Sequence, residues 1–362
     1  MRGATRFPTR RDLLNAIGGA GLASLASPVL RAQGVRGNRA LVCIYFPEGN
    51  DSNNMVVPVD GARYSAYAAA RGSLALDRTS LLTTSTPSGG EIGFHPSMGE
   101  LRDLFAAQRV AVVANVGAPD GAPPAHLLDS NLTYLPGGIA APQWAAAFTQ
   151  SGVVSASEVA AGSLGTRSIV RLASAPAGAT SSSPEWSRAF PQTRAGIQLE
   201  RVAAALAQRP EGAQFFFVPT STVAIGKSPL DRFAAAWRDL SVAMATFYSA
   251  TMELGIGYDV TTYTDGPFNR AMAPTAHGGA LPAWGGHQLV MGGSVLGGEI
   301  YGNFPDFTLG GPSDAGKTGI WKPGITKAEY YMALAKWAGL PDLELGRIFR
   351  SSASQPRLGF LA

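Results

Sequence analysis

Three short apolar runs, in which apolar and polar residues do not alternate, place the strongest limit on the fold of this chain. They cover residues 40–46, 109–116 and 213–218. A strand with one face in water alternates between apolar and polar residues, whereas a strand covered on both faces is apolar throughout. The runs therefore predict strands in the middle of a layered structure. The single cysteine, Cys43, lies in the first run, so we expect it to pack in the core.

Helical patterns lie between these runs. In the clearest, from Pro229 to about Glu253, apolar residues recur every three or four positions, and Ser228 before it is suited to the N-cap. Further helices are predicted over 97–107, 197–208 and from Ile325 or Thr326 to Ala338, and a further strand over 258–263. The alternation of strands and helices favours an α/β fold, with a doubly wound, mostly parallel sheet and helices on both faces.

Two segments lack any such period. Residues 134–196 are rich in Ser, Ala, Gly and Pro, and residues 79–90 form a shorter segment of the same kind. A length of 362 residues allows one large domain. We therefore expect a single domain over residues 33–362, with an irregular insertion at about 134–196 and a loop at 79–90.

The excess of basic residues lies at the N-terminus. Residues 1–32 hold five arginines and one aspartate and account for the whole formal net charge of +4. Arg10 and Arg11, followed by a glycine-containing apolar run that ends at Leu30, look like a twin-arginine export signal. The glycines make this run too weak for a spanning helix, and no other run approaches the roughly 18 apolar residues that one needs. We expect a signal peptide over residues 1–32 and no transmembrane segment.

Export has consequences for location and partners. Cleavage after Ala26 and cleavage after Ala32 both remain open. The expected location is the periplasm or the outside of a bacterial cell, and the twin-arginine translocase is the partner during export. Because acidic and basic residues balance in the rest of the chain, we expect no nucleic-acid partner.

A polar loop follows the first predicted strand and contains Asn50, Asp51 and Asn53. Ligands of parallel sheets gather at the carboxyl ends of the strands, so Asp51 is a candidate metal ligand or organiser of an anion site. The alternative is that all three side chains cap a turn by bonding to their own backbone. His287 is a second candidate, because the two glycines before it allow a close approach of the backbone to a site.

Two other well-known motifs do not predict a site in this chain. Residues 311–318 match the phosphate-loop pattern letter for letter. A phosphate loop must open a helix, and Gly319 and Pro323 follow too soon for one. No serine has the Gly-x-Ser-x-Gly frame of a nucleophile elbow. We predict neither a nucleotide site nor an elbow-type serine hydrolase.

Several segments together resemble the domain-of-unknown-function family 1501, a group of mostly twin-arginine-exported bacterial proteins in the alkaline phosphatase and sulfatase superfamily. The segments are residues 49–58, 93–96, 110–117, 283–293, 298–302 and 319–323. The resemblance implies an alkaline-phosphatase-like sheet that carries two divalent metals at strand ends, for hydrolysis of phosphate or sulfate esters. It makes Asp51 the metal acid of the first strand, and His126 and His287 the matching histidines.

Three segments depart from the family pattern. Members carry Gly-Gly-Phe-Asp-Thr-His where this chain has residues 219–225, which hold no acid and no histidine. In the segment that ends at Arg270, Pro267 replaces an acid, and Leu281 and Pro282 replace an Asp-His pair. Neither Pro nor Leu has a side chain that can bind a cation.

We therefore expect a catalytically degenerate protein, leaning away from an enzyme, that binds or assembles beside an active paralogue or a co-exported partner protein. Its vestigial site would consist of Asn50, Asp51, Asn53, His126, Arg270 and His287. No cofactor is expected. The alternative is a metal-dependent hydrolase of phosphate or sulfate esters with a single divalent metal, bound at most by Asp51, His126, His277 and His287.

Overall fold

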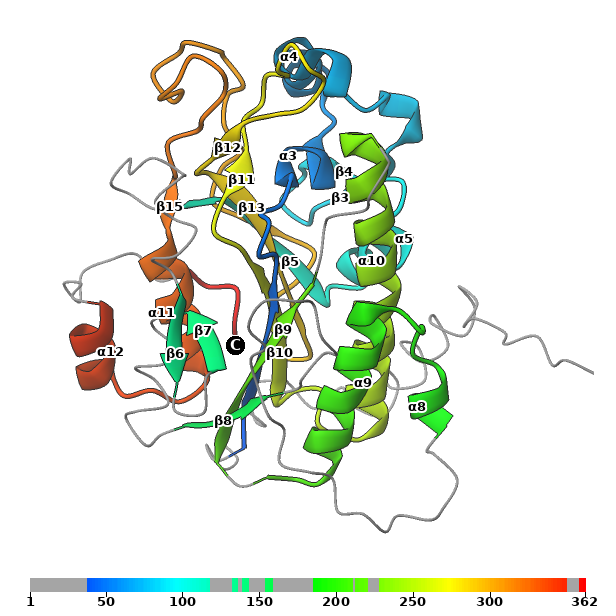
Figure 1. Ribbon diagram of the computed structural model, residues 1–362, viewed down its shortest axis with the longest axis vertical. Helices are drawn as coiled ribbons and strands as arrows, with labels where there is room; N and C mark the ends of the chain where they lie inside the picture. The colour runs from blue at the N-terminus through cyan, green and yellow to red at the C-terminus, as the bar shows by residue number, and fades with distance from the viewer. Residues whose placement is uncertain are drawn as a thin grey trace, which may run out of the picture.

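An eight-stranded sheet runs through the centre of the computed structural model (Figure 1). The structure describes residues 38–117, 132–135, 139–142, 154–158, 185–210, 212–220, 228–349 and 358–362. The strand order is β14-β5-β13-β10-β1-β9-β8, and β15 also pairs with β5. The strands are β1 (Ala40–Tyr45), β5 (Val110–Gly117), β8 (Val154–Glu158), β9 (Ala213–Pro219), β10 (Val260–Asp265), β13 (Gly286–Gly292), β14 (Ile300–Tyr301) and β15 (Ile325–Thr326).

The sheet is mostly parallel, as predicted. Strand β13 runs antiparallel to both of its neighbours, β10 and β5, whereas every other described pairing in this sheet is parallel. All six residues of β1 are buried. Val42 and Ile44 belong to the core on one side of the sheet, and Leu41, Cys43 and Tyr45 to the core on the other. This two-sided burial is why the strand pattern does not alternate.

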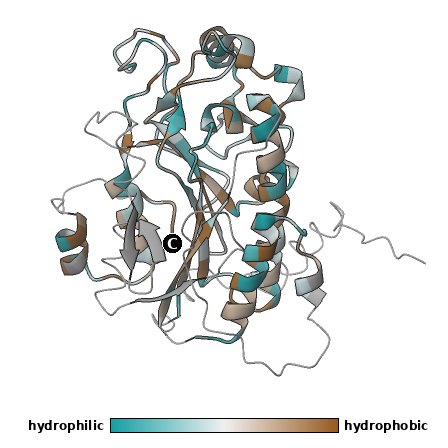
Figure 2. Cartoon of the chain, in the orientation of Figure 1, coloured by the Kyte–Doolittle hydropathy of each residue, from teal (hydrophilic) through white to brown (hydrophobic). Residues whose placement is uncertain are grey.

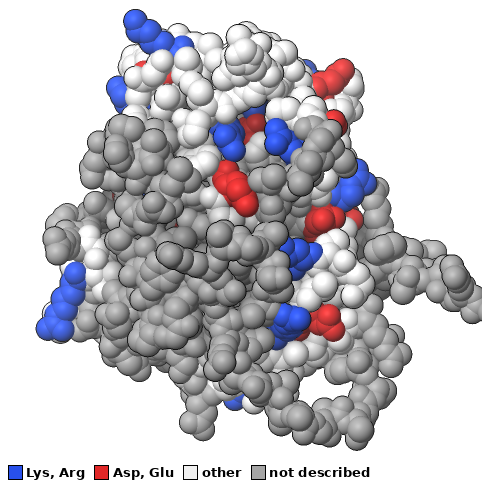
Figure 3. Space-filling view, viewed as in Figure 1, with Lys and Arg blue, Asp and Glu red and all other residues white. Residues whose placement is uncertain are grey.

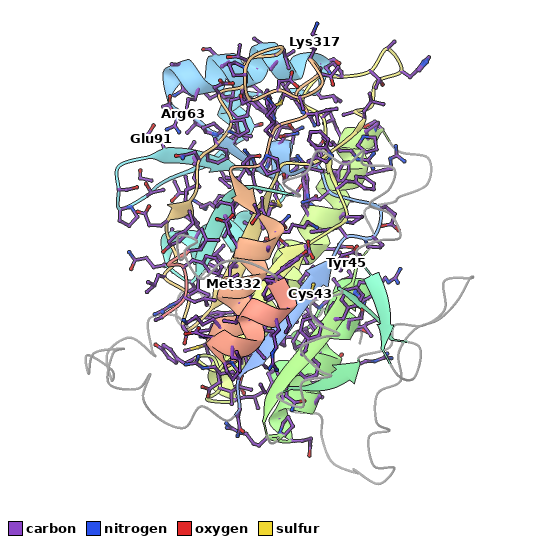
Figure 4. All side chains as sticks on the ribbon, turned by 90° about the vertical axis from the view of Figure 1, so that its left-hand side faces the viewer. Cys43, Tyr45, Arg63, Glu91, Lys317 and Met332 are labelled. Carbon is purple, nitrogen blue, oxygen red and sulfur yellow. The ribbon has the colours of Figure 1, made fainter. Side chains whose placement is uncertain are left out.

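Helices cover both faces of the sheet and confirm the predicted α/β class. The first face carries α5 (Gly99–Ala106), α9 (Arg194–Ala207) and α10 (Pro229–Glu253), and the second carries α11 (Lys327–Trp337) and α12 (Asp342–Phe349). Figure 4 views the second face: α11, which carries Met332, lies in front of β1 with Cys43 and Tyr45. Figure 2 shows the hydrophobic strands between the two helical layers.

The helix starts agree with their sequence signals. In α10, the Ser228 side chain accepts a hydrogen bond from the Asp231 backbone N–H, and Pro229 occupies the first turn. In α11, Thr326 and Glu329 form a reciprocal capping box. Both caps satisfy backbone N–H groups that a helix cannot bond internally, which fixes where each helix begins.

A smaller layer lies above the carboxyl end of β1. It consists of α3 (Ser52–Met55), β2 (Val56–Pro58), α4 (Gly61–Arg71), the 3-10 helices η1 (Gly72–Leu74) and η2 (Arg78–Ser80), β3 (Leu82–Ser85) and β4 (Glu91–Phe94). The prediction of a plain loop over 79–90 is therefore wrong, since it contains β3. This strand has four residues that pair with β4. Its residues are half-buried or exposed, so its sequence carries little apolar signal.

The segment at 134–196 also contains regular structure. A hairpin joins β6 (Leu132–Leu135) to β7 (Ile139–Pro142), and β8 pairs in parallel with β9 at the sheet edge. Helix α8 (Glu185–Arg188) and the start of α9 follow. A further short pair, β11 (Asn269–Arg270) with β12 (Pro282–Ala283), lies beyond β10. No helix among the described residues is long and apolar enough to cross a membrane. The expected signal peptide and both cleavage sites lie outside the described residues.

Candidate functional site

Asp51 lies in the segment that follows β1, as predicted, six residues after the last residue of that strand, and only 5% of its surface is exposed. Its carboxylate is paired with the guanidinium of Arg71, whose side chain is fully buried. Arg71 lies in the last turn of α4, which crosses above the sheet. A buried carboxylate needs a compensating cation. Here the cation is a side chain of the same chain.

The guanidinium of Arg71 is fixed by three further partners. Its Nε donates to Asn54 Oδ1 at 2.9 Å, and its Nη1 donates to the carbonyls of Ala271 and Met272 at 2.9 and 3.0 Å. Burial raises the pKa of Asp51, and the positive charge of Arg71 opposes that shift. The hydrogen bonds of Arg71 therefore hold its guanidinium in the orientation that pairs with Asp51.

Asn50 and Asn53, the two asparagines predicted as site residues, have different hydrogen-bond partners. Asn50 Oδ1 accepts from the Asp51 backbone N–H at 2.9 Å, which agrees with the turn-capping alternative, and also from Trp237 Nε1 at 3.0 Å. Asn53 Nδ2 instead donates to the carbonyl of Arg270 at 2.7 Å. The loop is thus tied to α10 on one side and to β11 on the other.

His287 lies on β13 beside this loop. Its Nδ1 accepts from the Asn115 backbone N–H at 3.1 Å, and its own backbone N–H donates to Ser52 Oγ at 2.7 Å. Its Nε2 is buried and has no hydrogen-bond partner in the described part of the chain. Burial lowers the pKa of His287 to about 3, so the imidazole is neutral at pH 7.

A cavity of about 20 Å³ borders His287, and its wall also includes Asn50, Ser52, Asp265 and Lys327. That volume holds about one water molecule. Asp265 accepts from Lys327 Nζ at 3.0 Å and from the Tyr331 hydroxyl at 2.6 Å, so its charge is already balanced.

A larger cavity of about 130 Å³ lies between the loop after β1, the first turns of α10, and β11. Its charged wall residues are Glu48, Asp51, Arg232 and Arg270. Asp51 borders this larger cavity, whereas His287 borders the smaller one. Figure 3 shows acidic and basic side chains side by side on the upper part of the face seen in Figure 1.

In the part of the chain that the structure describes, no three His, Cys, Asp or Glu side chains come together as metal ligands. His277 is exposed in the turn that follows Thr275, and His126 lies outside the described residues. One oxygen of Asp51 is engaged by Arg71, and a catalytic metal site needs about three protein ligands and an open position.

Several residues of the site were not found from the sequence. Asp265 ends a strand that was predicted to stop at residue 263, and an acid at a strand end was a usable signal. Lys327 lies in the first turn of α11 and borders the smaller cavity, and Arg232 lies in the first turn of α10 and borders the larger one. Their positions along the chain do not indicate that either residue lines a cavity. Arg71 was missed because a basic residue in a helix is normally exposed.

Residues 311–318, which match the phosphate-loop pattern, contain a carboxylate that accepts hydrogen bonds from the surrounding backbone. The carboxylate of Asp314 accepts four backbone N–H groups, at 2.9 to 3.0 Å, from Gly310, Gly316, Gly319 and Ile320. No helix starts there, as predicted. Of these four donors only Gly316 lies within residues 311–318, and its N–H is bonded to a side chain of the loop itself.

Comparison with known proteins gives weak likenesses. No family model matches the chain, and no curated protein matches it. Among solved structures it is similar to the zinc complex of the C-terminal periplasmic domain of EcEptC from Escherichia coli, with 11% identity over 84% of this chain and 83% of that chain and a TM-score of 0.41.

Two further structures are a putative sulfatase from Bacteroides thetaiotaomicron and a protein in the alkaline phosphatase superfamily from Vibrio parahaemolyticus. The first has 10% identity, covering 88% of this chain and 75% of that chain, with a TM-score of 0.40. The second has 10% identity, covering 83% of this chain and 72% of that chain, with a TM-score of 0.36. Such values carry no activity, ligand or residue role over to this chain, which its own sheet and helices define as a doubly wound α/β protein.

Proposed function

We propose that this chain is an exported, non-catalytic binding protein on an alkaline-phosphatase-like scaffold, in which Arg71 supplies the charge that a metal would otherwise bring to Asp51. The Asp51–Arg71 ion pair carries the proposal. The family resemblance implies that Asp51 binds a metal. In this chain the buried guanidinium of Arg71 neutralises Asp51 instead.

The magnitudes support this assignment. A divalent cation about 4 Å from the guanidinium would be repelled by roughly 8 kcal/mol, because two unit charges at that distance interact by about 4 kcal/mol at an effective dielectric constant of 20. The single charge of Asp51 offsets a comparable amount at the same distance, so favourable binding energy would have to come from further carboxylate or imidazole ligands. No three His, Cys, Asp or Glu side chains in the described part of the chain come together to supply such ligands.

Metal analysis tests the proposal. Full-length protein, purified and then incubated with zinc or manganese and desalted, should hold much less than one equivalent of metal. It should show no turnover of p-nitrophenyl phosphate or p-nitrophenyl sulfate. Stoichiometric metal that is lost in Asp51→Ala and in His287→Ala would overturn the proposal.

One observation favours the alternative of a single-metal hydrolase: the buried Nε2 of His287 has no partner in the described part of the chain. A neutral imidazole nitrogen of this kind is a good metal ligand. The same metal analysis decides between the two functions, because the hydrolase requires that metal content and ester hydrolysis disappear together in His287→Ala.

Export is the second element of the proposal, and Arg10 and Arg11 support it. Replacing both by lysine keeps the charge and should stop delivery to the periplasm, where the protein would meet a co-exported partner protein. The matched control is Arg31→Lys, which changes an arginine of the same segment outside the pair. Unchanged periplasmic yield in the double variant would remove the twin-arginine assignment.

A further inference from the structure

The cavity of about 130 Å³ has room for a small organic molecule. An engineered cavity of about 150 Å³ binds benzene, which has six non-hydrogen atoms, so this cavity has room for a molecule of about that size. Its wall combines charged and apolar side chains. The apolar part comes from Leu74, Pro229, Leu230 and Phe233, which are suited to cover a short chain of methylene groups.

Two carboxylate oxygens on this wall lack hydrogen-bond partners among the described residues. They are Oδ1 of Asp51 and Oε2 of Glu48, and both atoms are buried. Asp51 is 95% buried, since 5% of its surface is exposed. Arg71 holds the other oxygen, Oδ2. A buried carboxylate oxygen without a donor is costly, and an ammonium group offers three N–H donors that could satisfy both oxygens.

Two arginines on the same wall offer the opposite charge. Arg270 is held in place by a hydrogen bond from Nη2 to the Glu48 carbonyl at 3.1 Å and by the Phe268 ring, whose centroid lies 5.1 Å from its guanidinium carbon. Its Nε has no partner among the described residues. Arg232 lies in the first turn of α10, where the helix dipole adds positive potential.

The two arginines also repel each other. Burial lowers the pKa of Arg270, the charge of Asp51 opposes this, and the charge of Arg232 adds to it. An anionic group between the two guanidinium groups would relieve the repulsion, and arginine binds carboxylate and phosphate oxygens well.

Building on the proposed binding function, we propose that this cavity binds a small zwitterion, with its ammonium group on Asp51 and Glu48 and its anionic oxygen group on Arg232 and Arg270. The apolar wall covers the linker. Neither half of such a molecule alone would satisfy both sets of charges.

The test uses isothermal titration calorimetry on the full chain with 4-aminobutyrate and its two halves, butyrate and butylamine. We expect 4-aminobutyrate to bind with a Kd of about 1 mM or tighter and each half at least about tenfold more weakly. Equal binding of butyrate would show an anion site, and the absence of heat with all three would show a water-filled cavity. Either result overturns the inference.

Variants locate the site. Arg270→Gln and Glu48→Gln should each weaken 4-aminobutyrate binding by about tenfold or more. Arg63→Gln is the matched control, because Arg63 lies on the exposed side of α4 in a surface pair with Asp60. Thermal unfolding of each variant shows whether it is folded. Equal loss in all three variants would contradict the placement.

Failure here can be told apart from failure of the proposed function. If 4-aminobutyrate does not bind and the same preparation holds no metal and hydrolyses no ester, only the zwitterion assignment falls. If the preparation holds stoichiometric metal, the non-catalytic function falls, whatever the calorimetry shows.

Discussion

Arg71 and Asp51 form a buried ion pair between the last turn of α4 and the loop after β1, twenty residues apart in the chain. The pair joins the upper layer of the molecule to the carboxyl end of the central sheet. It therefore has a structural role as well as a role in the candidate site.

Arg71→Met should lower the free energy of unfolding by about 3–5 kcal/mol, because it leaves the Asp51 carboxylate buried without a partner. The double variant Asp51→Asn/Arg71→Met should recover a large part of this loss, since no unpaired charge remains. Urea unfolding of both variants and the native protein measures the difference. A loss below about 1 kcal/mol in the single variant would show that water reaches Asp51 after all.

Gly49→Ala should destabilise the protein by at least about 2 kcal/mol. Gly49 has a φ of +75°, and a Cβ there would lie 2.2 Å from Cε2 of Phe268, which borders the smaller cavity. The control is Gly61→Ala in the first turn of α4, where a Cβ meets nothing within 4 Å. That change should be neutral or stabilising by up to about 1 kcal/mol. Equal effects of the two changes in urea unfolding would contradict this account.

The sheet could be predicted from the sequence because burial on both faces leaves a direct trace. Strand β1 is apolar at every position, and its two faces carry residues such as Val42 and Cys43 into separate cores. The start of α10 was equally readable, since Ser228 caps it locally. In both cases the residues that determine the structure are neighbours in the sequence.

The site was only partly predictable because its charges come from distant segments. Asp51 could be placed at the end of β1 from chain order alone. Its partner Arg71 and the cavity residue Arg232 could not, since which charged residue of a helix turns inward depends on tertiary packing. The antiparallel direction of β13, which carries His287, also leaves no trace in its composition.

Stability should fall between pH 7 and pH 5 because two histidines are buried in neutral form. Burial lowers the pKa of His287 to about 3 and that of His95 to about 4, from 6.5. The unfolded chain binds protons below pH 6.5 and the folded chain does not, so stability is lost as the pH falls. Each histidine should cost roughly 2 kcal/mol at pH 5.

The double variant His95→Gln/His287→Gln should show a flatter dependence of unfolding free energy on pH over this range. The exposed residue His277 provides the control, and His277→Gln should leave the native slope unchanged. Urea unfolding at pH 5, 6 and 7 gives the slopes. The same slope in the double variant as in the native protein would show that other groups titrate there.

Asp314→Asn should lower the free energy of unfolding at pH 7 by about 2–4 kcal/mol. Each oxygen of Asp314 accepts two backbone N–H groups, from Gly316 and Ile320 on Oδ1 and from Gly310 and Gly319 on Oδ2. An asparagine would turn an NH₂ group toward one of these donor pairs. Partial burial alone would raise the pKa of Asp314, but these bonds lower it. Their contribution is therefore present above the unfolded pKa of 3.8 and is lost as the pH falls through the lower folded value.

Removing the carboxylate should also create an anion site. In Asp314→Ala the four N–H groups would face open space, and inorganic phosphate should take the place of the carboxylate and raise the melting temperature of the variant. The native protein should show no such effect, because its own Asp314 already fills the position. Asp306→Ala is the matched control: Asp306 accepts from Thr308 and Ser313 at the surface of the same loop, without a ring of N–H groups. If phosphate stabilises all three proteins equally, its action is a general salt effect and the loop is not held together by its internal anion.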